Sequence, residues 1–164
     1  MMNLLKRIPE NKLATFVLRY FGFRKIPLIF YVRPSVIELT NERVVIKIPF
    51  RRRTRNHLRS VYFGVLAVGA DIAGGLIAWN LIRSSRQRVA LIFKSFHADF
   101  LKRAEGDVYF TCTQGTEIAA LVNEAIETGE RVEKPVEVIA TVPGKFGEDP
   151  VAKFVLILSL KKFN

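Results

Sequence analysis

The chain has 164 residues, of which 49% are hydrophobic and 25% are charged, and its formal net charge is +11. This length supports one sizeable hydrophobic core and is short for two, so we expect a single domain over residues 1–164. One cysteine excludes an internal disulfide bond, and two histidines offer no spacing typical of a metal site, so we expect neither a metal nor another cofactor.

The first third of the chain predicts one helix and two strand-like segments. Residues 27–39 are expected to be extended around Pro34, and a turn at 40–42 leads to an alternating strand over 43–50. A short amphipathic helix is predicted over residues 10–20, ending at 21–23, because apolar residues recur there at helical spacing: Leu13, Phe16, Val17 and Tyr20.

The basic charge is concentrated before the middle of the chain. Residues 1–60 contain 14 Lys and Arg against 3 acidic residues, whereas residues 61–164 contain 12 of each. A cluster of this kind attracts polyanions such as nucleic acid, an anionic membrane surface or the phosphates of a ligand, and a solvated basic loop is the alternative. No zinc pattern or recognition helix accompanies it, so nucleic acid is not expected as a partner. The cluster is densest at Arg51, Arg52, Arg53, Arg55 and Arg59.

Residues 60–82 form a 23-residue apolar segment with one acid, Asp71, near its middle. As a helix the segment is about 35 Å long, enough to cross a bilayer core of about 30 Å. Asp71 and Asn80 argue against a membrane span, and so do the flanking strand-like segments, which need one continuous partner. We therefore interpret the segment as a helix buried inside the fold, without stable membrane insertion, and a buried Asp71 suggests chemistry.

The second half of the chain predicts four strands and a helix. The strands cover residues 88–101, 107–113, 132–142 and 151–163, the last two flanking a turn at 143–145. The helix runs from Thr116, the expected N-cap, to Gly129. On the first of these strands we expect one apolar side: Ala90, Ile92, Phe96, Ala98 and Phe100.

These elements together predict an α+β architecture. A helix without a polar face is satisfied when a curved antiparallel sheet wraps around it, so we expect a hotdog fold of about six strands around the long central helix. An extra N-terminal helix and a helix before the last two strands complete the predicted arrangement.

The start of the central helix carries a resemblance. The segment RNHLRSVYFGVLAVGAD is similar to the hotdog thioesterase superfamily, in which an Asn precedes a His-Gly-Gly helix start and an acid follows seven residues after the second glycine. Asn56, Gly64 and Asp71 occupy these positions. The segment ADFLKRAEGDVYFTC resembles the family's strand–turn–strand signature. The order of helices is most similar to the uncharacterised thioesterase-like branch called DUF4442.

The resemblance implies hydrolysis of acyl-CoA or acyl-carrier thioesters. The amide of Gly64, aided by the helix dipole, would polarise the thioester carbonyl, and Asp71 would act as general base or nucleophile. Asn56 would position substrate or water. The resemblance also implies a homodimer with sites between subunits, and it leaves open whether two dimers pair into a tetramer. A cytoplasmic location is expected because the amino terminus lacks an apolar signal region.

The chain departs from the family pattern at the helix start. Tyr62 and Phe63 stand where many members have His-Gly, and Arg59 replaces a loop glycine. These bulky residues are expected to line the substrate pocket. They also leave open the alternative that the protein binds acyl groups without cleaving them. Arg59, Lys102 and Arg103 would contact the phosphates of CoA.

Each site residue also has a structural alternative. Asp71 could serve only to hydrogen bond backbone groups or a basic side chain across the dimer, Gly64 could serve helix packing, and Asn56 could be a turn residue. The sequence shows no base near Cys112, and His57 and His97 are interpreted as surface or sheet residues.

Overall fold

A computed structural model describes residues 10–163 of the chain. Its core element is a six-stranded antiparallel sheet with the strand order β1-β2-β4-β5-β6-β3. The strands are β1 (Ser35–Leu39), β2 (Val44–Ile48), β3 (Val89–Phe100), β4 (Val108–Cys112), β5 (Arg131–Thr141) and β6 (Pro150–Lys162). The sheet therefore ends in β1 on one edge and in the longer β3 on the other.

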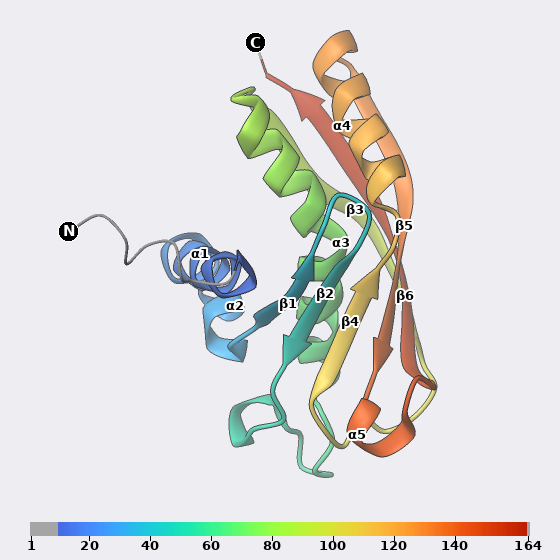
Figure 1. Cartoon of the computed structure of the whole chain (residues 1–164). Coiled ribbons are helices and arrows are strands. Elements are labelled where there is room, and N and C mark those ends of the chain that lie inside the picture. The colour runs from blue at the N-terminus through green and yellow to red at the C-terminus, as the bar shows by residue number, and fades with distance from the viewer. Residues whose placement is uncertain (1–9, 164) are drawn as a thin grey trace, which may run out of the picture.

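Helix α3 (Phe63–Ser85) lies in the concave side of the curved sheet, as Figure 1 shows. Residues 72–78 in the middle of this helix are all buried, so the protein covers the apolar side chains on every side of it. Helix α4 (Gly115–Thr128) packs on α3, β5 and β6. The predicted hotdog fold is confirmed: a curved antiparallel sheet wraps the long apolar helix.

Helix α3 is the one described helix that is long and apolar enough to cross a membrane. Within its most hydrophobic 18-residue window, 67% is buried inside the structure. The sheet and the neighbouring helices supply this cover, so α3 is the buried core helix of the fold, and the interpretation made from the sequence holds.

The N-terminal segment differs from the prediction in two ways. Helix α1 (Glu10–Lys25) runs past the expected stop at 21–23, because Gly22 serves close packing rather than helix termination. A Cβ atom on Gly22 would lie 2.8 Å from the backbone nitrogen of Phe30. Pro27–Val32, predicted to be extended, instead forms the short helix α2, for which Pro27 supplies a favourable first residue.

The predicted apolar face of α1 was also assigned to the wrong side. Leu13, Phe16 and Tyr20 are more than half exposed, whereas the helix buries Leu18 and Gly22. The helix carries apolar residues on both faces, so periodicity alone could not tell which one packs on the core.

Three predictions in the second half need smaller corrections. The N-cap of α4 is Gln114, not Thr116, and residues 143–146 form a short helix, α5 (Pro143–Phe146), rather than a simple turn. In β3 a register shift between Phe93 and Phe96 interrupts the alternation. Leu91 and Phe93 consequently face α3, and Ile92 is half exposed, so the predicted single apolar side was wrong for the first half of the strand.

The remaining described element is a single turn of 3₁₀ helix, η2 (Arg52–Thr54), inside the basic loop. The buried Thr54 anchors this turn: its hydroxyl donates to the carbonyl oxygen of Pro49 at 2.9 Å. The arginines on either side of Thr54 point outward and are exposed.

Glycines of α3 set its distance from the sheet, and two of them make a matched pair for a stability test. A Cβ atom on Gly69 would lie 2.2 Å from the ring of the buried Phe110, whereas one on Gly74 would meet its neighbours at an ordinary 3.5 Å. We expect Gly69→Ala to lower the free energy of unfolding by about 1–3 kcal/mol through overpacking. Gly74→Ala should raise it by up to about 1 kcal/mol through helix propensity. Urea denaturation measures both, and equal effects of the two substitutions would contradict the packing described.

Candidate functional site

An apolar cavity of about 480 Å³ lies between the two N-terminal helices, α3 and the first half of β3. Its size suits a small ligand or part of an acyl chain. Among residues 10–163, Asp71 is the only charged residue in its wall. The other lining residues are Leu18, Phe21, Ile26, Ile29, Ile72, Gly75, Leu76, Trp79, Leu91, Ile92 and Phe93.

Asp71 is half-buried in this wall, and its carboxylate forms no hydrogen bond or ion pair with any of residues 10–163. Burial in apolar surroundings raises the pKa of the Asp71 carboxyl above its ordinary value, because the charged form loses hydration. Residues 10–163 of one chain therefore offer Asp71 no partner group, and a basic side chain across a dimer stays an open alternative. A desolvated and unpaired carboxylate is suited to accept a proton.

A second groove, also of about 480 Å³, opens at the amino terminus of α3. The loop before the helix and the segment after β3 form its two sides. Five of the predicted site residues lie together here: Asn56, Tyr62, Phe63, Lys102 and Arg103. Asp71 does not line this groove, so a single chain divides the predicted site into two parts.

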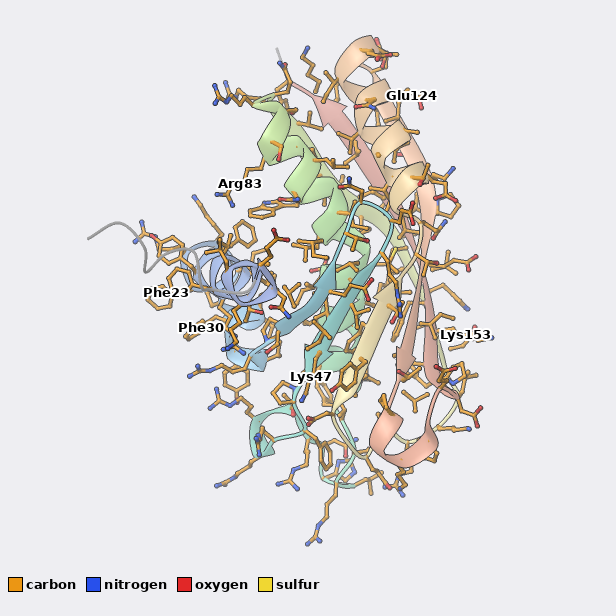
Figure 2. The ribbon with its side chains drawn as sticks, in the orientation of Figure 1. Phe23, Phe30, Lys47, Arg83, Glu124 and Lys153 are labelled. Carbon is orange, nitrogen blue, oxygen red and sulfur yellow. The ribbon has the colours of Figure 1, made fainter. Side chains whose placement is uncertain are left out.

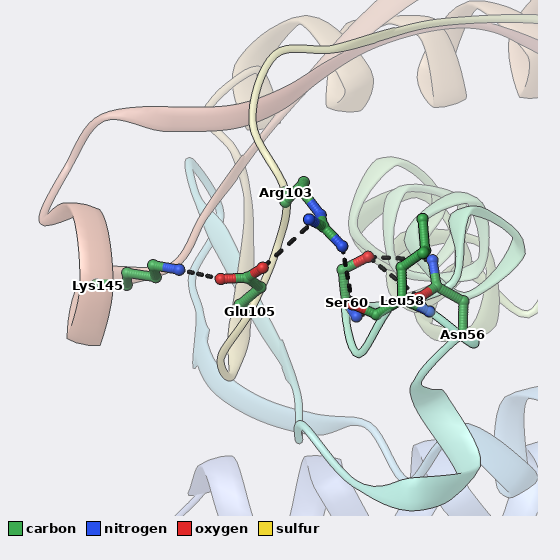
Figure 3. Close-up of polar contacts among 6 residues, drawn as sticks. All are labelled: Asn56, Leu58, Ser60, Arg103, Glu105 and Lys145. Atoms are coloured by element: carbon green, nitrogen blue, oxygen red, sulfur yellow. Dashed lines mark hydrogen bonds and ion pairs between the residues drawn. The ribbon is translucent and has the colours of Figure 1, made fainter.

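Asn56 holds the loop that forms one side of the groove (Figure 3). Its side-chain oxygen accepts hydrogen bonds from the backbone N–H of Leu58 at 2.9 Å and of Ser60 at 3.1 Å. Its amide nitrogen donates to the hydroxyl of Ser60 at 3.0 Å. Both the oxygen and the nitrogen of the Asn56 amide therefore form hydrogen bonds within the loop. This arrangement fits the alternative that Asn56 is a turn residue, and its contact with substrate stays a prediction.

Arg103 and Lys102, which line the groove, form polar contacts with neighbouring residues. Arg103 donates to the carbonyl oxygen of Leu58 at 2.8 Å and pairs with Glu105, which also pairs with Lys145 (Figure 3). Lys102 pairs with Asp149 at 3.0 Å. These ion pairs are exposed and contribute little to stability, so both cations can exchange partners for a ligand anion.

The backbone at the start of α3 offers free donors. Tyr62 is the N-cap, its backbone N–H donates to the carbonyl oxygen of Thr54, and no side chain caps the helix. The amides of Phe63 and Gly64 donate to no acceptor among the described residues, as expected in a first helical turn. A Cβ atom on Gly64 would lie 2.6 Å from the ring of Tyr62, so that ring covers Gly64 closely.

Arg59 lies on the same loop but outside the lining of the groove. Its φ is +58°, in the left-handed region that glycine adopts most easily. This backbone conformation explains why the family pattern has a glycine at this position. Arg59 is exposed, and its contact with a ligand stays a prediction.

The remaining candidate side chains occupy simple positions. His97 is exposed on β3 and pairs with Asp99 at 3.4 Å, whereas His57 is exposed on the wall of the second groove. Cys112 is buried, and burial raises the pKa of its thiol, which disfavours the thiolate.

The sequence interpretation missed the contribution of the N-terminal helices to the cavity. Leu18, Phe21 and Ile29 come from α1 and α2, and Trp79 packs on Phe21 with ring centroids 5.4 Å apart. The available signal was the second apolar face of α1, centred on Leu18 and Gly22, which the stronger outward pattern concealed.

Comparison with protein families gives one match. The profile of DUF4442, described as a domain of unknown function, matches residues 15–145. The chain belongs to the DUF4442 family. This match covers most of α1, all of α2 and α3 and the first five strands, so the cavity and the groove lie within the family domain. The comparison with curated proteins found no match.

DUF4442 membership agrees with the solved structures that resemble the chain. A Pseudomonas aeruginosa protein of unknown function, described as a "Probable Thioesterase", is 25% identical with a TM-score of 0.73, covering 91% of this chain and 96% of its own. A Chlorobaculum tepidum protein of unknown function is 12% identical with a TM-score of 0.78, covering 93% and 97%. A Haemophilus influenzae thioesterase is 12% identical with a TM-score of 0.61, covering 82% of each chain. At these lower identities the likeness shows the fold.

The raised pKa of Asp71 makes stability depend on pH in a definite direction. In the unfolded chain the carboxyl ionises near its ordinary value of 3.8, whereas in the DUF4442 fold it holds its proton to higher pH. The folded state binds more protons between these two values, so stability falls as pH rises through them. We expect the stability advantage of Asp71→Asn over wild type to grow as pH rises from 3.8 and to level off above the raised pKa. Urea titrations over a series of pH values measure this advantage, and one that is constant or shrinks with pH would contradict it.

Proposed function

We propose that this DUF4442 protein is a thioesterase-like enzyme that hydrolyses acyl-CoA or acyl-carrier thioesters. The observation that carries the proposal is the carboxylate of Asp71, which pairs with none of residues 10–163 and lies in the wall of an apolar cavity. The cavity would hold the acyl chain, and Asp71 would lie beside the thioester carbon as general base for water or as nucleophile. The resemblance to the "Probable Thioesterase" of Pseudomonas aeruginosa supports the same activity.

The free amides at the start of α3 would stabilise the oxyanion. Gly64 follows the first residue of the helix, where backbone N–H groups and the helix dipole both favour negative charge. A seven-residue spacing places Gly64 and Asp71 on the same side of α3, but about 10 Å apart along its axis. That separation is too long for both groups to act on one carbonyl within a single chain.

A homodimer formed through β3 would bring Asp71 of one subunit close to Gly64 of the other. β3 is an edge strand, and among the described residues it pairs only with β6. Residues 91–93 of β3 line the cavity with Asp71, whereas Phe100 lines the groove at the start of α3. A twofold axis between residues 95 and 96, close to the middle of β3, would place residues 91–93 of one copy beside residues 98–100 of the other. Asp71 of one subunit and Gly64 of its partner would then face one substrate.

The basic residues around the groove would bind the phosphates of the acyl carrier. Lys102 and Arg103 line the groove, and Arg59 lies on its loop. Guanidinium groups suit phosphate oxygens because they donate two parallel hydrogen bonds. Phe63 and Tyr62 would form the apolar wall near the reacting carbonyl.

One observation favours a second candidate function, which is binding of acyl groups without hydrolysis. The ring of Tyr62 lies over Gly64 and covers the region where the oxyanion would form. Tyr62 is 48% exposed, so its side chain has room to turn away when substrate enters. If Tyr62 stays in place, the same cavity would hold an acyl chain and leave the thioester intact.

The test is release of free thiol from short, medium, long and aromatic acyl-CoAs. We expect wild type to turn over at least one of them and Asp71→Asn to lose about 10²–10⁴-fold in rate, because loss of a general base has this effect. The matched control is Glu124→Gln, which neutralises an exposed acid on α4 far from the cavity and should retain full activity. Folded wild type that binds acyl-CoA but releases no thiol would support the binding protein instead, and equal rates for wild type and Asp71→Asn would remove Asp71 from the mechanism.

A further inference from the structure

Helix α1 presents an apolar stripe to solvent. Its inner side buries Leu18 and Gly22 against the rest of the fold. Its outer side has four large apolar residues at spacings of three, four and three, which lie on one side of a helix. They are between 54% and 67% exposed: Leu13, Phe16, Tyr20 and Phe23.

Helix α2 extends this stripe into a continuous surface. Leu28 and Tyr31 are also more than half exposed. Within the surface Phe16 stacks on Tyr20 with ring centroids 6.4 Å apart, and Phe23 meets Phe30 edge-on at 5.4 Å. We name these residues the α1–α2 face: Leu13, Phe16, Tyr20, Phe23, Leu28, Phe30 and Tyr31. An exposed apolar surface with this many aromatic rings is typical of an interaction site.

Basic side chains border the α1–α2 face. Helical spacing places Lys12 and Arg24 on the two flanks of the α1 stripe. The guanidinium of Arg33 lies over the ring of Phe30 at 5.2 Å, and that of Arg53 lies over Tyr31 at 5.5 Å. Glu10 is the only acidic residue in α1 and α2.

A basic groove of about 960 Å³ adjoins Tyr31 at the end of the face. No acidic residue of the described part of the chain lines it, although Lys47 in its wall pairs with Asp107 at 2.7 Å. Its basic lining residues are Arg19, Arg33, Lys47, Arg51, Arg52 and Arg53. The apolar face and the positive charge of the chain therefore occupy one region of the molecule.

We propose that the α1–α2 face binds the surface of an anionic phospholipid bilayer. The aromatic rings would lie at the boundary between headgroups and acyl chains, where such rings are most stable, and the arginines and lysines would contact lipid phosphates. The charge distribution supports this occupant, since the whole net charge of +11 falls within residues 1–60. A second copy of the chain fits less well, because a symmetric contact would bring the same basic residues together.

The α1–α2 face lies next to the apolar cavity, so membrane binding would place the cavity close to lipid. Phe21 and Ile29 line the cavity from the same two helices whose outer sides would contact the membrane, and Ile26 lines it from the junction between them. Ile26 is also 44% exposed, so it lies at the boundary between the cavity and the surface. A docked molecule would hold its acyl cavity beside a membrane. This inference does not depend on hydrolysis, because an acyl-binding protein would use the same arrangement.

The test is cosedimentation of the full chain with lipid vesicles. We expect binding to vesicles that contain phosphatidylglycerol, much weaker binding to pure phosphatidylcholine, and loss of binding as salt rises. The double variant Phe16→Ser/Phe23→Ser should weaken the partition at least about tenfold through lost apolar contact. Lys12→Glu/Arg24→Glu should weaken it by about fivefold or more per residue.

Two control variants lie away from the face. Phe163→Ser removes a 54% exposed aromatic ring near the carboxyl end of β6, and Lys153→Glu reverses a charge on the outer side of the sheet. Figure 2 shows Phe23 and Phe30 on the helical side of the molecule and Lys153 on the opposite side. Phe163 lies outside the α1–α2 face, so Phe163→Ser should bind vesicles as well as wild type. Lys153→Glu changes a charge away from the face and should bind far better than Lys12→Glu/Arg24→Glu.

Three outcomes would overturn the proposal. The first is wild type that binds neither kind of vesicle. The second is Phe16→Ser/Phe23→Ser that binds as well as wild type while urea denaturation shows it folded. The third is an oligomer, measured by ultracentrifugation without lipid, that this variant dissociates, because a second copy would then cover the face.

Discussion

The need to cover an apolar helix on all sides determines the rest of this structure. Helix α3 has no polar face, and the curved sheet covers it from one side only, between the edge strands β1 and β3. Gly69 lets the helix approach Phe110 closely on that side. Helices α1, α2 and α4 cover the rest of α3 incompletely, and the space that remains beside α1 and α2 is the apolar cavity. The cavity is thus a consequence of how the helix is enclosed.

Asp71 matters because of where this enclosure places it. A carboxylate on the sheet side of α3 would have been surrounded by packed side chains, whereas Asp71 lies in the wall of the cavity, within reach of a ligand. Burial raises its pKa, and no described residue neutralises it. The free amides at the start of the same helix supply the complementary partial positive charge. Both groups come from one helix, but they serve one reaction only if a second copy supplies one of them.

Much of the fold could be predicted because its signals are local and redundant. The apolar run of α3, the alternation of the strands and the turn residues between them all pointed to a sheet around a helix. The errors arose where one pattern allowed two packings. Helix α1 is apolar on both faces, so its period could not distinguish Leu18 from Phe16, and the register shift in β3 depends on pairing with β6. The division of the site between a cavity and a groove is a property of three-dimensional distance, which spacing in the sequence does not encode.

The central claim is that Asp71 of one subunit and the Gly64 amide of its partner act on the same thioester. Gly64→Pro removes that amide hydrogen in the first helical turn, where the backbone tolerates proline, and Gly64→Ala controls for the added Cβ atom beside the Tyr62 ring. Asp71→Asn and Gly64→Pro chains, each inactive alone, should be unfolded together, refolded and assayed for thiol release. A mixed dimer would contain one site with both native groups, so the account predicts that activity returns in the mixture. Refolded mixed dimers that release no thiol, alongside active wild type treated in the same way, would contradict it.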